Sequence, residues 1–226
     1  MVHMGKDGTS IIRRPSHPIV KTIRRGLEII QAPLTFDMDV WEGVKYGPEP
    51  EQNIDLWELN DLAPRDGWPA VLFISDDGWI EGSPESFRVQ APLLARRGIV
   101  GASASYRSSE AQSWQVQLSD ILSAIEILKQ LQTDPTRIAL WGVGRGGDLA
   151  LAAAQRLGPQ KIRAVATFAA IKEGFKPNNA DEALNVLSFP TDSNLMSFKE
   201  AHRWLGELLT DKQRGSKWKI RRKKKR

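Results

Sequence analysis

The sequence contains no cysteine and only three histidines among its 226 residues. Without cysteine, disulfide bridges and thiolate zinc sites are excluded. It also lacks any apolar run of about 18 residues or more, the length that a membrane-spanning helix needs. The N-terminus does not show the basic and then apolar layout of a secretory signal. We therefore expect a cytoplasmic protein without a membrane span, and nothing in the composition calls for a cofactor.

Acidic and basic residues are distributed unevenly along the chain. Residues 212–226 hold ten Lys or Arg and no acid, and residues 1–36 hold six basic and two acidic residues. Of the 32 basic and 27 acidic residues in total, this leaves 16 basic and 25 acidic for residues 37–211. We expect a basic, loosely ordered N-terminal extension (1–36), one folded domain (37–211) and a basic tail or truncated last strand (212–226).

Strand-like and helix-like segments alternate through the folded part. A hairpin is predicted first, and then buried apolar runs of strand length are separated by segments with helical spacing. Such alternation is typical of an α/β protein with a mostly parallel central sheet and helices on both faces. The strands are expected at 39–47, 53–60, 68–75, 98–106, 136–142, 162–170, 185–192 and 215–223, and the helices at 83–98, 113–131, 146–158 and 193–209.

Right-handed crossovers place every strand-to-helix turn of a parallel sheet at the same rim, where ligands bind in this class of fold. The turns 75–83, 105–113 and 142–147 are therefore expected to meet. The stretch "ALWGVGRGGDLALAAA" contains the third of them. An apolar strand enters a glycine-rich turn that opens onto a helix, which is the outline of the nucleophile elbow G-x-S-x-G. The turn is formed by Gly142, Gly144, Arg145, Gly146 and Gly147, and its central position, Gly144, has no side chain.

Three stretches share their order and spacing with one family of enzymes. They read "GVKYGPEPEQNIDLWELN", "PAVLFISDDGWIEGS" and "DPTRIALWGVGRGGDLALAAA". With them, residues 39–170 resemble the N-terminal two-thirds of an α/β-hydrolase of the carboxylesterase, acetyl-xylan and feruloyl esterase (BD-FAE-like) type. The resemblance implies the α/β-hydrolase fold, truncated in its C-terminal part, and an ancestral reaction in which a serine attacks an ester carbonyl with help from a histidine and an acid.

The catalytic motifs of that family are altered in this chain. Gly144 stands at the serine position. Where the family has the oxyanion motif H-G-G-G, this chain has Ser75, Asp76, Asp77 and Gly78, and two carboxylates there would repel a developing negative charge.

The remaining family positions are also incomplete. Trp79 matches a residue that borders the acyl pocket, and Asp192 stands roughly at the acid position. No histidine follows at the expected place, and His202 falls inside a predicted helix, where it is expected to pack or to lie on the surface. The sequence thus predicts an esterase-like protein without catalytic residues, retaining a binding or scaffolding role, with an ester-like small molecule as the expected ligand.

Two other functions stay open. One is an active carboxylic-ester hydrolase that uses residues other than those of the family motif. The other is binding of nucleic acid or another acidic partner through the basic residues 212–226, with Trp218 available to stack on a base. A basic run is equally consistent with a solvated end that aids solubility.

The charged residues of the rim allow one specific expectation. Arg145 begins the helix after the elbow, and we predict that it pairs with Asp76 or Asp77 and fills the former oxyanion site. The alternative is that all three are solvated surface charges. No metal site is expected, because nothing fixes the geometry of Asp76, Asp77 and Asp148 around an ion.

Overall fold

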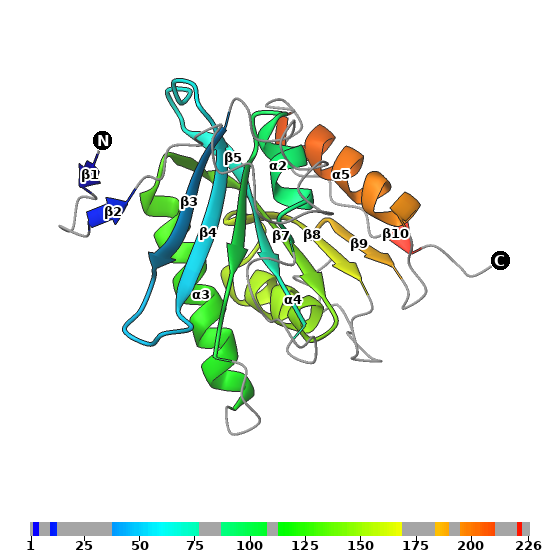
Figure 1. Ribbon diagram of the computed structural model, residues 1–226. Coiled ribbons are helices and arrows are strands. Elements are labelled where there is room, and N and C mark those ends of the chain that lie inside the picture. The colour runs from blue at the N-terminus through cyan, green and yellow to red at the C-terminus, as the bar shows by residue number, and fades with distance from the viewer. Residues whose placement is uncertain are drawn as a thin grey trace, which may run out of the picture.

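The computed structural model describes residues 2–4, 10–12, 38–76, 87–107, 113–168, 184–189, 195–210 and 221–222. In these ranges a central sheet lies between helices on both of its faces (Figure 1). The elements in chain order are β1 (Val2–Met4), β2 (Ser10–Ile12), β3 (Met38–Lys45), β4 (Asn53–Leu59), β5 (Trp68–Ile74), α2 (Gln90–Ala95), β6 (Val100–Ala104), α3 (Trp114–Gln130), β7 (Thr133–Val143), α4 (Arg145–Leu157), β8 (Ile162–Phe168), β9 (Val186–Phe189), α5 (Leu195–Thr210) and β10 (Arg221–Arg222).

The sheet of the described residues has eight strands in the order β10-β9-β8-β7-β5-β6-β4-β3. Strands β10 to β6 in that order pair in parallel, whereas the hairpin β3–β4 closes one edge in antiparallel pairing. Ile74 is in register with Ala104 on one side and Gly142 on the other, so β5, β6 and β7 end at the same level. The predicted α/β architecture and its mostly parallel sheet are confirmed.

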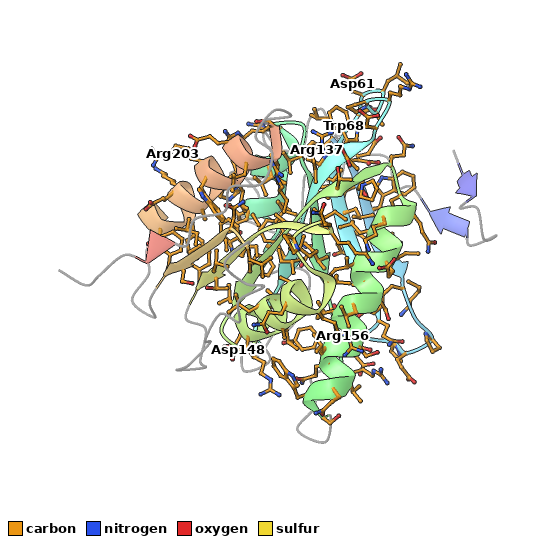
Figure 2. All side chains as sticks on the ribbon, turned by 180° about the vertical axis from the view of Figure 1, so that it is seen from behind. Asp61, Trp68, Arg137, Asp148, Arg156 and Arg203 are labelled. Carbon is orange, nitrogen blue, oxygen red and sulfur yellow. The ribbon has the colours of Figure 1, made fainter. Side chains whose placement is uncertain are left out.

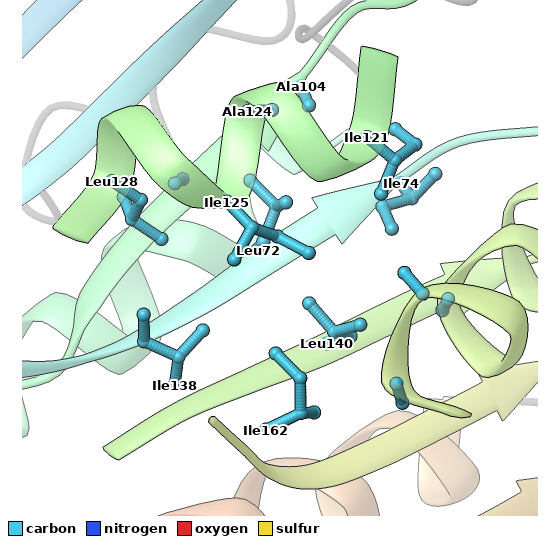
Figure 3. Close-up of a cluster of buried hydrophobic side chains, with 14 of the residues drawn as sticks. Leu72, Ile74, Ala104, Ile121, Ala124, Ile125, Leu128, Ile138, Leu140 and Ile162 are labelled. Atoms are coloured by element: carbon cyan, nitrogen blue, oxygen red, sulfur yellow. The ribbon is translucent and has the colours of Figure 1, made fainter. Parts of the chain in front are cut away.

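Alternating side chains of the strands fill two separate cores. On β5, Leu72 and Ile74 pack with α3 and α4, while Val71 and Phe73 pack with α2 and α5. This follows from the period of two along a strand, which sends successive side chains to opposite faces. Figure 3 shows the first core, where Ile121, Ala124, Ile125 and Leu128 of α3 lie over the aliphatic side chains of β5, β7 and β8.

Helix boundaries agree with the sequence in one case and differ in another. Helix α3 begins after Ser113, whose hydroxyl accepts a hydrogen bond from the backbone N–H of Val116, as the predicted start requires. Helix α2 was expected to begin after Ser83, which lies outside the described residues. Residues 87–89 form turns, and the α-helix begins only at Gln90, without a side-chain cap. The helix ends where predicted, because Gly98 follows it with φ +71°.

An ion pair links the amino ends of β5 and β7, at the end of the sheet opposite to the carboxyl ends of these strands. Arg137 donates from Nε to Asp134 Oδ2 at 2.6 Å and from Nη2 to the carbonyl oxygen of Gly67 at 3.2 Å. Burial alone would raise the pKa of Asp134, but hydrogen bonds from Thr136 and Arg137 outweigh it and lower that pKa. Figure 2 shows Arg137 at this end, far from Asp148 of α4.

The predicted segment boundaries fall mostly outside the described residues. Of the N-terminal segment, β1 and β2 form a two-stranded antiparallel sheet that the sequence did not predict. Of residues 212–226, only β10 is described, where Arg221 and Arg222 pair with β9 at the edge of the main sheet. None of the helices in the described ranges is long and apolar enough to cross a membrane. The three-segment division and the cytoplasmic location stay predictions.

Candidate functional site

Three strand-to-helix turns meet at the carboxyl ends of β5, β6 and β7. The Tyr106 hydroxyl, after β6, donates a hydrogen bond to the carbonyl oxygen of Ser75, after β5, at 2.9 Å. The backbone N–H of Arg145, after β7, donates to Asp76 Oδ1 at 3.1 Å. The common rim predicted from the order of the elements is therefore present, and Asp76 lies at its centre.

The turn between β7 and α4 has a backbone that only glycine adopts readily. Gly144 has φ +53° and ψ −123°, a region where a residue with a side chain is strained by about 1–3 kcal/mol. Its N–H donates to the carbonyl oxygen of Phe168 at 2.8 Å, and its own carbonyl oxygen accepts from the N–H of Gly147 at 2.9 Å. These bonds fix the turn between β8 and the first turn of α4.

Two further glycines of the turn, Gly142 and Gly146, are required by close approach of the main chain. A Cβ on Gly142 would lie 2.3 Å from the carbonyl oxygen of Gly146, and a Cβ on Gly146 would lie 2.2 Å from that of Ile74. Backbone atoms of this kind cannot move aside without moving β5 or α4. The glycine spacing of the motif is thus explained by how closely the turn packs on the sheet.

The Asp76 side chain occupies the space above Gly144. A Cβ built on Gly144 would lie 2.2 Å from Asp76 Oδ2 and 2.4 Å from Asp76 Cγ, far inside van der Waals contact. The obstacle at Gly144 is thus the end of a side chain, unlike the backbone obstacles at Gly142 and Gly146. Asp76 Oδ1 also accepts a hydrogen bond from the Arg145 N–H. One carboxylate therefore occupies the place of a side chain at position 144 and pairs with the first N–H of α4.

Arg145 reaches across the rim to α3. Its Nε donates to Gln117 Oε1 at 3.0 Å, and its guanidinium lies 4.9 Å from the centre of the Trp114 ring. The contact between Arg145 and Asp76 runs through the backbone N–H. Asp77 lies outside the described residues, so the predicted ion pair between Arg145 and a rim aspartate stays a prediction.

A buried polar network holds the neighbouring turn. Arg107 donates to Asp120 from its backbone N–H and from both Nε and Nη2, at 2.7–3.1 Å, and Gln52 Nε2 donates to the same carboxylate at 2.7 Å. Burial alone would raise the pKa of Asp120, but these hydrogen bonds outweigh it and lower that pKa. Nearby, the Tyr46 hydroxyl donates to the Ser105 carbonyl oxygen at 2.5 Å, and burial raises the pKa of Tyr46.

The sequence reading missed Gln117 and Gln52 as parts of this rim. A signal for Gln117 exists, because it lies one turn before Asp120 and Ile121 on the buried face of α3 and is itself 1% exposed. Gln52 gave no such signal, since it lies in the hairpin turn between β3 and β4. Its role follows only from the pairing of β4 with β6, which brings that turn to α3.

The remaining predicted site residues divide into two groups. Ser75 is buried at the end of β5 and Gly147 lies in the first turn of α4, whereas Asp77, Gly78, Trp79 and Asp192 lie outside the described residues. His202 is buried in α5, its ring 5.1 Å from that of Trp141, so it packs in the core between α5 and the sheet. Within the described ranges, no group of three or more His, Asp or Glu side chains is arranged to hold a metal ion.

Comparison with known proteins agrees with this geometry. The model of the BD-FAE family matches residues 60–214, which is more than half of the chain. The chain belongs to the BD-FAE family. The match includes β5, the glycine-rich turn around Gly144 and α5, and it places the chain in an esterase-type α/β-hydrolase lineage.

Individual relatives of this BD-FAE protein are esterases. Esterase LipC of Mycobacterium tuberculosis (strain H37Rv) is 32% identical over 112 residues, which cover 47% of this chain and 27% of LipC. Esterase LipQ of the same organism is 30% identical over 121 residues, 49% of this chain and 28% of LipQ. The chain thus spans less than a third of the length of these relatives.

Solved structures share the fold of this BD-FAE protein. Esterase B from Lactobacillus rhamnosis superposes with a TM-score of 0.54 over 79% of this chain and 59% of its own, at 20% sequence identity. At that identity the likeness shows the α/β-hydrolase fold alone.

Proposed function

We propose that this chain is a member of the esterase lineage that does not hydrolyse esters and that retains a binding role. The observation that carries the proposal is the Asp76 carboxylate above Gly144, hydrogen-bonded to the N–H of Arg145. Ester hydrolysis requires a nucleophile and a free oxyanion donor. In this arrangement Gly144 provides no nucleophile, and the N–H of Arg145 is already bound to Asp76.

The nucleophile is the first requirement. In the esterase elbow a serine stands at the position that Gly144 holds here, and glycine has no atom that could attack a carbonyl carbon. Removing the nucleophile from a serine hydrolase lowers kcat by about six orders of magnitude. Ser75 at the end of β5 does not offer an activated hydroxyl in its place, because it is buried and its hydroxyl has no hydrogen-bond partner among the described residues.

The oxyanion donor is the second requirement. In this fold the N–H of the residue after the nucleophile, here Arg145, stabilises the negative charge that develops on the carbonyl oxygen. Asp76 Oδ1 accepts that N–H at 3.1 Å and carries a charge of the same sign as the oxyanion. Losing one such donor costs about 10²–10³-fold in rate, and the adjacent carboxylate adds repulsion. Both effects oppose ester hydrolysis, which supports a binding role over catalysis.

A fluorophosphonate probe tests this proposal directly. The probe forms a covalent bond with an activated serine oxygen and releases fluoride, which the intact mass of the protein reports. We expect no adduct on the natural protein under conditions that label an active serine esterase completely. A stoichiometric adduct would overturn the proposal, and peptide mapping would then identify the nucleophile.

The Gly144→Ser variant sharpens the same experiment. If the rest of the rim has lost its catalytic function, the variant also stays unlabelled. Labelling of the variant alone would mean that a base able to activate the new hydroxyl survives and that the serine is the missing part.

The basic residues 212–226 carry a second candidate function, the binding of nucleic acid. Ten of these fifteen residues are Lys or Arg, and Trp218 lies among them. Phosphate binding by such a segment releases counterions, so affinity should fall steeply with salt. We expect retention of a single-stranded oligonucleotide at low salt that is lost when residues 212–226 are removed. Equal retention by the shortened and full-length proteins would exclude this function.

A further inference from the structure

We infer that Asp76 and Gly144 form a mutually dependent pair, in which the Asp76 carboxylate closes the elbow in its observed position because residue 144 has no side chain. The inference rests on the proposed function, because it names the contact that occupies the space above Gly144 in the glycine-rich turn. It makes its own claim, however, about how two residues 68 positions apart depend on each other.

The first step is the overlap in space. The position of a Cβ on Gly144 lies 2.2 Å from Oδ2, 2.4 Å from Cγ and 2.9 Å from Oδ1 of Asp76. All three distances are shorter than any real contact of a Cβ atom. The carboxylate in its observed position and a side chain at position 144 therefore exclude each other, and the carboxylate must shift to make room for a Cβ.

The second step is what keeps the carboxylate in place. Asp76 Oδ1 accepts the backbone N–H of Arg145, which begins α4 and lies at the positive end of the helix dipole. That N–H lies in the first turn, so no carbonyl oxygen of α4 can accept it. A carboxylate at this point satisfies the donor with the charge that the helix end prefers.

The third step is the position of Asp76 relative to the rest of the rim. Its main chain continues directly from Ser75, whose carbonyl oxygen accepts the Tyr106 hydroxyl at 2.9 Å. The carbonyl oxygens of Ile74 and Ser75 lie 2.2 Å and 2.4 Å from where a Cβ on Gly146 would be. The backbone beneath Asp76 is thus packed against α4, and its side chain closes the elbow from a fixed base.

A double-mutant cycle tests the pair by thermal unfolding of the full-length chain. Gly144→Ala adds only the Cβ, and Asp76→Ala removes only the carboxylate. We expect Gly144→Ala to lower Tm by about 3 °C or more beyond its effect in the Asp76→Ala background. The three atoms nearest to the added Cβ all belong to the Asp76 carboxylate group, which the Asp76→Ala background lacks. Part of the Gly144→Ala effect comes from the positive φ and is the same in both backgrounds, so the cycle cancels it.

Gly158 supplies a matched control. It follows α4 with φ +77°, and a Cβ on it would meet nothing within 4 Å. Gly158→Ala should therefore lower Tm by the same amount with and without Asp76→Ala. Coupling at position 144 together with additivity at position 158 supports the pair. If Gly144→Ala is equally costly in both backgrounds, the carboxylate does not close the elbow and the inference is wrong.

The outcome stays distinguishable from the proposed function. Labelling of the natural protein by the fluorophosphonate would refute the absence of catalysis, whatever the cycle gives. An additive cycle would refute the closing role of Asp76, even if no labelling occurs.

Discussion

The two faces of the sheet bury polar groups in opposite ways. On the face covered by α3 and α4, the buried Asp120 and Gln117 both have hydrogen-bond partners, from Arg107 and Gln52 in one case and from Arg145 in the other. On the face covered by α2 and α5, the buried Trp141 Nε1 and both ring nitrogens of His202 have no hydrogen-bond partner among the described residues.

The two faces differ in hydrogen bonding because one lies beside the turns of the candidate site and the other is an aromatic core. The paired groups of α3 hold the two turns that flank the candidate site, the one after β6 through Asp120 and the elbow through Gln117. The unpaired ring of His202 lies among aromatic side chains, including Phe198 and Phe168 around Trp141, and is held by packing alone. The charged Asp120 therefore lies where hydrogen bonds fix the geometry of a turn, and the neutral His202 ring lies where it only fills space in the core.

The largest expected effect is the loss of Asp120. Asp120→Ala would leave Gln52 and the Arg107 side chain without their common acceptor in a site that is 1% exposed at Asp120. We expect the free energy of unfolding to fall by about 3 kcal/mol, measured by denaturant titration at pH 7. Glu126→Ala is the control on the same helix, because Glu126 forms an exposed pair with Lys129, and it should cost about 0.5 kcal/mol or less. If Asp120→Ala and Glu126→Ala lowered the free energy of unfolding equally, the buried hydrogen bonds of Asp120 would contribute no more than a surface ion pair.

The next effect concerns pH and the other face. Burial, with a smaller contribution from Arg97, lowers the pKa of His202 to about 4. The unfolded chain binds the proton more readily, so His202 contributes stability that is present at neutral pH and lost as the pH falls from about 6.5 towards 4. Between pH 7.5 and pH 5 we expect a loss of about 2 kcal/mol.

The variant His202→Leu should remove most of that pH dependence. Carboxylates with lowered pKa, such as Asp120 and Asp134, lose their contribution mainly below the ordinary carboxyl pKa of 3.8, so the window above pH 4.5 reports on His202. If the natural protein and the variant lose stability in parallel over this window, the ring is not held neutral by burial.

The smallest effect concerns the link between α3 and the elbow. Gln117→Leu keeps the volume of a buried side chain but removes the acceptor of Arg145 Nε. We expect a loss of about 1 kcal/mol in unfolding free energy, together with a change in tryptophan fluorescence because the guanidinium lies 4.9 Å from the Trp114 ring. Leu118→Ala, on the neighbouring half-buried position, should affect stability without that spectral change. Unchanged fluorescence in Gln117→Leu would show that Gln117 does not position Arg145.

Several features of the fold were predictable because they repeat locally. Apolar runs such as 68–75 predicted buried strands, and helical spacing of apolar residues predicted the helix 113–131, of which Ile121, Ile125 and Leu128 are buried in α3. The predicted helix start at Ser83 and Pro84 lies outside the described residues and stays a prediction, whereas residues 87–89, expected to be helical, form turns.

The candidate site was predictable only in part. The sequence located the glycine-rich turn between β7 and α4, and the interpretation of Gly144 as the former serine position stays a prediction. The expected pairing of the Arg145 side chain with Asp76 or Asp77 stays a prediction, and the sequence did not predict that the backbone N–H of Arg145 would contact Asp76. A helix N-terminus offers its main-chain donors to whatever lies before it, and side-chain charge alone gives no sign of this.

The sequence by itself determined the alternation of strands and helices, the family, and the absence of a side chain at position 144. Each of these depends only on residues that are close together in the sequence. Only the tertiary structure decided what fills that place. Strand order puts β5 beside β7, and the parallel register of Ile74 with Gly142 brings Asp76 above Gly144. A contact between residues 68 positions apart depends on pairing across the sheet, which local sequence does not specify.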